Sequence, residues 1–199
     1  MSDHQHSSIY LKDYTPPLYL VTTVGLRFEL KESATRVFSR MEIMRNPSSS
    51  QQNIPLELNG EKLEHLVLSL DGARLASDRY TYDGKLLRIA AVPDRFVLEV
   101  ENIINPRDNT ELEGLYLSSG NFCSQCEAEG FRRITCFPDR PDVMAVFTTT
   151  IVADRKKYPV LLANGNLREQ GYLDDGRHFA VWHDPFPKPS YLFALVAGD

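Results

Sequence analysis

Apolar and polar residues alternate with a period of two over long stretches of this chain. The first two stretches lie at 24–30 and 37–43, and a short turn at 32–34 separates them. Successive side chains of a strand point to opposite faces, so this alternation predicts strands that are buried on one face only. Two such strands joined by a short turn predict a β-hairpin.

Shorter apolar runs continue the pattern to the end of the sequence. They lie at 56–58, 66–70, 80–82, 87–92, 96–100, 147–153, 160–163, 178–182 and 191–196. Asn-Gly, Asp-Gly and proline-rich turns separate many of them, and strands at such short spacing are typical of sandwiches and curved sheets. No window of ordinary helix length has a period of 3.6, so we expect only short helical turns, at 127–132 and 141–145.

These patterns predict an all-β fold, an antiparallel β-sandwich-like domain of curved sheets. The polar loop at 46–52 is followed by more strands of the same kind, so we expect residues 1–199 to form a single domain. Only three residues follow the final apolar run, which is typical of a sequence cut just after the last strand of a domain.

Composition and charge narrow the classes of function. The chain of 199 residues is 42% hydrophobic and 25% charged, as in ordinary globular proteins. Its formal net charge of -5 argues against binding to nucleic acid or to an anionic membrane. No apolar run approaches the roughly 18 residues of a membrane span, and residues 1–8 lack the apolar segment of a signal peptide. Three cysteines, an odd number, then indicate free thiols in a reducing cytoplasm.

All three cysteines lie in one segment, which raises the question of a metal or redox site. Cys123 and Cys126 form a C-x-x-C pair, Cys136 would supply a third zinc ligand, and Asp139 or a distant histidine would have to supply the fourth. A redox pair would be expected in an α/β setting, which the strand pattern does not provide. The third interpretation is that the cysteines are small buried or half-buried apolar residues, and we favour it.

The histidines give no metal motif. His178 and His183 flank a predicted strand, and because they are five residues apart they point to opposite faces. His4 and His6 lie in the polar N-terminal tail, and His65 stands alone. The sequence also lacks the H-E-x-x-H, phosphate-loop and G-x-S-x-G motifs.

The charged and polar residues after the C-x-x-C pair are the remaining candidates for chemistry. They comprise Gln125, Glu127, Glu129, Arg132 and Arg133. From spacing alone, we favour a solvated loop of mixed charge over a binding site. A sugar-binding β-sandwich is another alternative, but the chain has a single tryptophan where such sites use aromatic platforms.

The segment 114–143 resembles the corresponding stretch of the bacterial aminopeptidase N family, zinc metallopeptidases of the gluzincin class. It reads G-L-Y-L-S-S-G-N-F-C-S-Q-C-E-A-E-G-F-R-R-I-T-C-F-P-D-R-P-D-V. The combination of Q-x-E, R-R and D-x-P carries the resemblance, and I-Y-L-K-D-Y, Y-P-V-L-L-A-N-G-N and the last 18 residues extend it over essentially the whole chain. More distant members often read P-C-F-D-x-P where this chain reads C-F-P-D-R-P, which implies that Cys136 has no required role.

The resemblance implies that this chain is the saddle-shaped N-terminal β domain of such an enzyme. The family's next domain is thermolysin-like and carries G-x-M-E-N and H-E-x-x-H, and this chain contains neither motif. We therefore expect zinc in the parent enzyme, and no metal, cofactor or catalytic residue in this chain. The expected partners are the catalytic domain of the same polypeptide and the N-terminus of a peptide substrate, in a cytoplasmic monomer. The alternative is a stand-alone β-sandwich binding module without enzymatic activity.

The resemblance also implies a role for one carboxylate. In the family, the glutamate of Q-x-E reaches into the catalytic cleft and contacts the free α-ammonium group of the substrate. The matching residue is Glu127, with Gln125 beside it. The family further has a cis peptide bond after this glutamate, which here would join Glu127 to Ala128.

Overall fold

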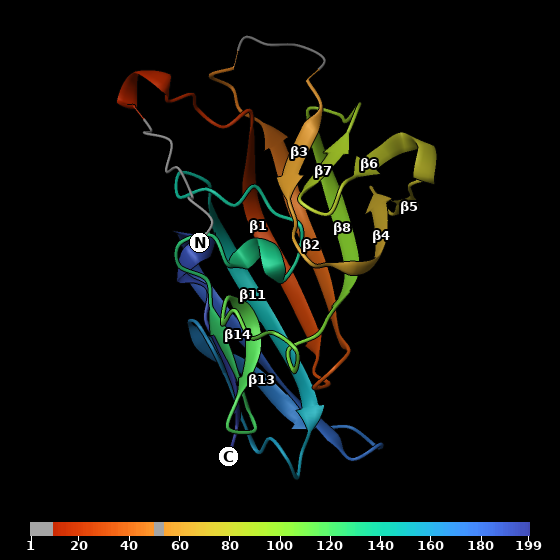
Figure 1. The fold of residues 1–199 in the computed structure, drawn as a ribbon, viewed down its shortest axis with the longest axis vertical. Coiled ribbons are helices and arrows are strands. Elements are labelled where there is room, and N and C mark those ends of the chain that lie inside the picture. Colours follow the sequence, from red (N-terminus) through yellow and green to blue (C-terminus); the bar gives the residue numbers. More distant parts are fainter. Residues whose placement is uncertain (1–9, 50–53) are drawn as a thin grey trace, which may run out of the picture.

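Three β-sheets and four short 3-10 helices make up the computed structural model, which describes residues 10–49 and 54–199 (Figure 1). The residues outside these ranges include His4, His6, the segment 1–8 that was compared with a signal peptide, the start of the I-Y-L-K-D-Y motif, and part of the predicted polar loop at 46–52. Within the described ranges, no helix is long and apolar enough to cross a membrane.

The largest sheet has eight strands and forms the frame of the fold. In spatial order they are β13 (Asn166–Tyr172), β14 (Arg177–Pro189), β11 (Met144–Asp154), β1 (Tyr19–Glu29), β2 (Thr35–Arg45), β8 (Arg95–Ile104), β4 (Glu64–Leu70) and β5 (Ala73–Arg74). β1 and β2 form the predicted antiparallel hairpin. β1 and β11, however, pair in parallel, with Thr23 opposite Val146. Parallel pairing is possible because a long crossover joins the two strands. A prediction based on hairpins alone gives only antiparallel pairs.

Two smaller sheets complete the strands. The four-stranded sheet contains β12 (Val160–Ala163), β15 (Leu195–Gly198), β10 (Asn121–Gln125) and β9 (Gly114–Ser118), and the three-stranded sheet contains β3 (Leu56–Asn59), β7 (Leu86–Ile89) and β6 (Tyr80–Tyr82). The 3-10 helices are η1 (Leu11–Asp13), η2 (Ser77–Arg79), η3 (Phe131–Arg133) and η4 (Ser190–Leu192).

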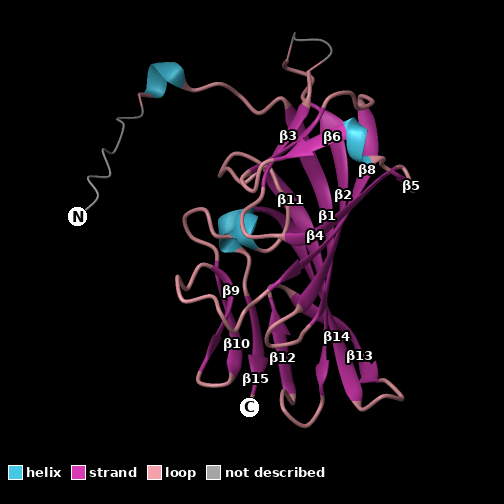
Figure 2. Cartoon of the chain, turned by 45° about the vertical axis from the view of Figure 1, so that its right-hand side comes forward, coloured by secondary structure: helices cyan, strands magenta, loops and turns pink. Residues whose placement is uncertain are grey.

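The core lies on one face of the large sheet. In β2 the inward residues Val37, Met41 and Ile43 are buried, whereas Arg36 and Arg40 of the other face are exposed. Phe122 of the four-stranded sheet and Leu58 of the three-stranded sheet belong to the same core cluster. Both small sheets therefore cover the same face, at opposite ends of the long twisted sheet (Figure 2). This arrangement of curved sheets, which do not close into a barrel, confirms the predicted all-β fold class.

Several element boundaries differ from the prediction. The helical turn expected at 127–132 is the shorter η3, and the one expected at 141–145 is a turn that passes into β11. The run at 191–196, expected as a strand, begins inside η4 and reaches strand geometry only in β15. The prediction also lacked β9, β10 and β13. β13 is exposed at nearly every position because it is an edge strand, so it has no alternation to detect.

Candidate functional site

The segment that carries the Q-x-E motif leaves the four-stranded sheet as an exposed turn. β10 lies between β15 and β9 and ends at Gln125. The chain then turns through 126–130 and enters η3 at Phe131. The Gln125 and Glu127 side chains are both exposed, whereas Cys126 between them is buried. Of the two residues that the resemblance singled out, Gln125 therefore ends β10 and Glu127 lies on the solvent-facing turn that follows, with the buried Cys126 side chain between them.

Close backbone contacts define the shape of this turn. The Gly130 amide donates a hydrogen bond to the Cys126 carbonyl over 2.9 Å. The peptide bond between Glu127 and Ala128, which the resemblance implies to be cis, is cis in the structure. A Cβ atom on Gly130 would lie 2.4 Å from the carbonyl oxygen of Gln125, so only glycine fits where the turn folds back on the strand.

The two exposed glutamates of the turn differ in their partners. The Glu129 carboxylate pairs with the Arg132 guanidinium over 3.1 Å. Among the residues that the structure describes, the Glu127 carboxylate has no hydrogen bond or ion pair, and the Gln125 side chain donates only to the Glu127 backbone carbonyl, over 3.3 Å. Glu127 therefore presents a full negative charge that is available to a ligand, whereas the charge of Glu129 is already partnered.

A shallow cavity of about 310 Å³ lies beside the turn. It is lined by Glu127, Ala128, Glu129, Asp139, Arg140, Pro141 and Tyr191. Three of these residues are acidic and one is basic, and Asp139 and Arg140 have partners of their own. The free charge in the lining is thus the Glu127 carboxylate, which suits a cationic group that donates charge-assisted hydrogen bonds.

The cysteines do not form a metal site with their neighbours. All three are free thiols, with Cys126 and Cys136 buried and Cys123 half-buried. Burial, and secondarily the nearby Asp139 carboxylate, raise the pKa of the Cys126 thiol. Burial also raises the pKa of the Cys136 thiol to about 12. Within residues 10–49 and 54–199, no three histidine, cysteine, aspartate or glutamate side chains are placed to hold a metal ion. The interpretation as small buried or half-buried residues therefore fits all three cysteines.

We expect only Cys123 to react with a thiol reagent in the native chain at pH 8. The thiolate is the reacting form, and burial suppresses both access and ionisation at Cys126 and Cys136. Counting the modified cysteines by mass spectrometry should give one in the native state and three after unfolding in urea. Rapid labelling of all three native cysteines would contradict the buried positions.

The two histidines of β14 have structural partners. The His178 Nε2 atom lies 2.7 Å from the Tyr158 carbonyl oxygen, and the His183 Nδ1 atom lies 3.0 Å from the Thr148 hydroxyl. Both histidines belong to β14, and their different partners agree with side chains that point to different faces.

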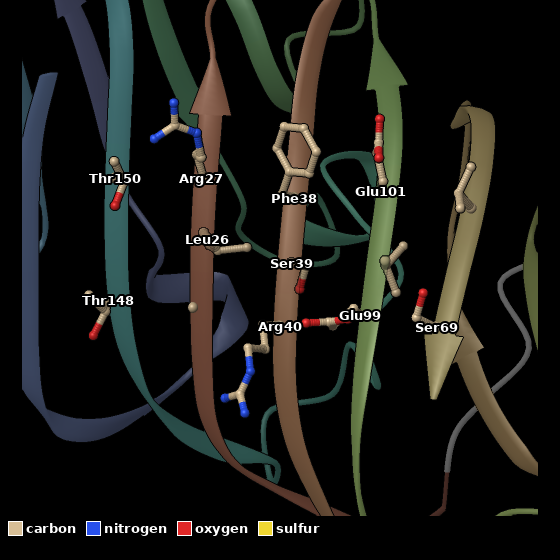
Figure 3. A pocket seen from close by; sticks show the side chains of 13 residues that line it. Leu26, Arg27, Phe38, Ser39, Arg40, Ser69, Glu99, Glu101, Thr148 and Thr150 are labelled. Carbon is tan, nitrogen blue, oxygen red and sulfur yellow. The ribbon is translucent and has the colours of Figure 1, made fainter. Parts of the chain in front are cut away.

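A second hollow, of about 480 Å³, lies on the outer face of the large sheet (Figure 3). Side chains from five strands surround it, but its two arginines each pair with a glutamate, Arg27 with Glu29 and Arg40 with Glu42, both over 3.3 Å. This face is the one that the small sheets leave uncovered, so the hollow is remote from the turn. Among the described residues, the Glu99 carboxylate of this hollow also has no hydrogen bond or ion pair, so an unpartnered carboxylate does not by itself separate the two places. We assign the candidate site to the turn because the turn carries Glu127 of the Q-x-E motif.

The sequence did not predict the hydrogen bonds that support the turn. Asp139 accepts hydrogen bonds from Arg132 and from the hydroxyl of Ser190. The D-x-P and R-R motifs were a signal for the first pair, but nothing in the sequence pointed to Ser190, because it lies 51 residues from Asp139.

The fold and the site together define an all-β domain that presents an unpaired carboxylate on an exposed turn. The chain matches the Peptidase M1 N-terminal domain family over residues 26–192. It therefore belongs to the peptidase M1 family, as an N-terminal domain of that family, which confirms the resemblance seen in the sequence.

Its similarity to individual proteins agrees with this assignment. The chain is 51% identical over 192 residues to aminopeptidase N of Caulobacter vibrioides and 47% identical over 195 residues to aminopeptidase N of Escherichia coli. These matches cover 96% and 98% of this chain but only 22% of each relative, so the chain spans about a fifth of their length.

Solved structures share the fold. Aminopeptidase A of Legionella pneumophila, in complex with aspartic acid, superimposes with a TM-score of 0.90 at 36% identity, over 95% of this chain and 22% of that one. An M1 zinc metallopeptidase of Deinococcus radiodurans has a TM-score of 0.76 at 16% identity, over 90% of this chain and 42% of that one, which shows the common fold alone. The relatives favour an aminopeptidase domain over a stand-alone binding module.

Proposed function

We propose that this chain is the N-terminal domain of a zinc-dependent aminopeptidase and that Glu127, with Gln125 beside it, binds the α-ammonium group of a peptide substrate. The single observation that carries this proposal is the unpartnered Glu127 carboxylate on an exposed turn, next to a glutamate whose charge is already paired. The names of the relatives, which are aminopeptidases, support the class of reaction.

The physical reason is that an exopeptidase must measure distance from the end of a chain. A fixed carboxylate that accepts hydrogen bonds from the ammonium group provides this measurement, with about 1.5–3 kcal/mol for each charge-assisted bond. Holding the ammonium group also places the first peptide carbonyl at the reacting centre, which is an orientation effect. Gln125 lies at the end of β10, and its side-chain amide donates a hydrogen bond to the Glu127 backbone carbonyl over 3.3 Å.

The described residues of this chain, 10–49 and 54–199, do not fit a zinc ion. Two of the three thiols are buried and kept protonated by their raised pKa, and the Asp139 carboxylate is already taken up by Arg132 and Ser190. The proposal therefore places the zinc and the catalytic residues in the part of the polypeptide that this chain does not span, and the chain alone is inactive. A cytoplasmic role in peptide catabolism, as a monomer, is in keeping with three free thiols.

Exposed apolar side chains on the outer face of the four-stranded sheet support the proposal that another domain packs against it. Val160 and Leu162 of β12 and Val196 of β15 are exposed, and Leu162 lies directly opposite Val196. Adjacent exposed aliphatic side chains mark surfaces that bind other proteins or domains. β10, which ends at Gln125, belongs to the same sheet, so a catalytic domain that covers this face would also meet the Glu127 turn.

The proposal is tested with the full-length protein from the same reading frame and a matched pair of peptides. We expect hydrolysis of the first residue from a peptide with a free amino terminus, and none from the same peptide acetylated at that terminus, because acetylation removes the charge that Glu127 meets. Chromatography of the released amino acid provides the measurement. Equal hydrolysis of both peptides would contradict a site that binds the α-ammonium group.

A further inference from the structure

A buried carboxylate lies beneath the exposed turn. The side chain of Asp139 is 1% exposed. One of its oxygens accepts hydrogen bonds from the backbone amide and the Nε atom of Arg132, both over 3.1 Å, and the other accepts from the Ser190 hydroxyl over 2.5 Å. All of these donors belong to the protein, so Asp139 is not available to a substrate. It serves the structure around the site.

Arg132 connects this buried carboxylate to the turn. Its side chain is 14% exposed, and its guanidinium donates through Nε to the Asp139 carboxylate and through an Nη atom to the Asp139 carbonyl. The remaining Nη atom pairs with Glu129 over 3.1 Å. A planar guanidinium bound on three sides has a fixed orientation. The position of Glu129, two residues after Glu127, is thereby tied to Asp139.

The network also joins segments that are distant in the sequence. Ser190 begins η4, between β14 and β15, and the Asp139 amide donates to the side chain of Asn59 in β3 over 3.2 Å. The Arg132 carbonyl accepts a hydrogen bond from the Glu61 amide over 2.9 Å. Asp139 thus ties the base of the turn to β3 of the three-stranded sheet and to η4, which precedes β15.

We infer that Asp139 is a positioning residue, which fixes Arg132 and through it holds the turn that presents Glu127. Without the Asp139 charge, Arg132 would be a largely buried cation that lacks its main partner. It would move toward solvent or toward Glu61, which lies 4.0 Å from one of its Nη atoms, and the turn would lose its support. The consequence for substrate binding rests on the proposed function, whereas the consequence for the turn does not.

The effect on the turn is measured in this chain by amide hydrogen exchange, with Asp139→Asn as the variant. The reporter is the Gly130 amide, which bonds to the Cys126 carbonyl and does not touch Asp139. We expect its exchange to become about 10-fold faster, while the amides of β2 and β8 keep their rates. Unchanged exchange at Gly130, or an equal acceleration over the whole domain, would overturn the inference.

Two further variants are needed, one as a control and one as a replacement if Asp139→Asn does not fold. Asp94→Asn removes an aspartate that is 80% exposed and pairs with Arg45 at the surface, and we expect no change at Gly130. If Asp139→Asn does not fold, Ser190→Ala removes one donor to Asp139 and leaves the charge pair in place. It should accelerate Gly130 exchange in the same direction and by less, and no acceleration would count against the network.

A double-mutant cycle in the full-length protein tests whether Asp139 acts through Glu127. We expect Asp139→Asn to lower kcat/KM by about 10-fold in the unmodified protein, but by less than about 2-fold when Glu127→Gln is already present. Effects that simply multiply would show that Asp139 does not act through Glu127. If Glu127→Gln alone leaves activity unchanged, the proposed function fails, and the exchange measurement still decides whether Asp139 holds the turn.

Discussion

Glu127→Gln is expected to lower kcat/KM of the full-length protein by roughly 10- to 100-fold on peptides with a free amino terminus. Glutamine keeps the shape of the side chain and removes the charge that is proposed to meet the substrate ammonium group. The loss corresponds to about 1.4–2.7 kcal/mol, the scale of one charge-assisted hydrogen bond. Steady-state kinetics with a series of peptide concentrations provide the measurement, and zinc content should be unchanged because Glu127 is not proposed as a ligand.

Whether the loss appears in kcat or in KM distinguishes a contact that binds the substrate from one that positions the scissile bond. If the ammonium contact is equally strong in the bound substrate and in the transition state, KM rises and kcat is unchanged. If it mainly positions the scissile bond, kcat falls. We expect both, because under the proposed function the same carboxylate would bind the amino terminus and set its distance from the reacting carbonyl.

Glu129→Gln is the matched control, two residues away on the same turn. Glu129 is 68% exposed and already paired with Arg132, so its charge is not free for a substrate. We expect a much smaller loss of kcat/KM than for Glu127→Gln, arising through Arg132 rather than through the ammonium group. A pair of variants in which Glu129 mattered more than Glu127 would assign the ammonium site to the other carboxylate.

The frame of the fold could be predicted because its central strands are buried on one face. The alternation at 24–30 and 37–43 became the β1–β2 hairpin. The edge strand β13 could not be predicted in this way, since both of its faces are largely exposed and its residues carry no alternation. The parallel pairing of β1 with β11 was equally out of reach, because it joins strands that are far apart in the sequence.

Part of the candidate site could also be predicted from the sequence, and part could not. The resemblance identified Gln125 and Glu127, and the structure places Gln125 at the end of β10 and Glu127 on the exposed turn that follows. Spacing alone could not separate Glu127 from Glu129, because the difference lies in which carboxylate meets Arg132. That contact depends on the geometry of the turn and of η3. The support from Ser190 depends on packing between distant segments, which a local sequence pattern does not encode.

Phe131→Ala should destabilise the chain by about 3–5 kcal/mol, a large share of the roughly 5–15 kcal/mol by which such domains are stable. Phe131 is fully buried at the start of η3. Its ring meets the rings of Phe137, Phe193 and Phe147 edge-on, at centroid distances of 5.1, 5.4 and 5.9 Å. Removing it therefore leaves a cavity among three rings that come from different segments and cannot all move inward together.

Urea unfolding of the chain measures this change, with Phe186→Ala as the matched control. Phe186 is 75% exposed, so its truncation should alter the free energy of unfolding by no more than about 0.5 kcal/mol. A loss below about 1 kcal/mol for Phe131→Ala would mean that the surrounding rings refill the space, contrary to the close packing seen here. Phe131 directly follows the turn that carries Glu127, so the same variant should also accelerate amide exchange at Gly130. Such an acceleration would link the packing of the core to the position of the proposed ammonium-binding carboxylate.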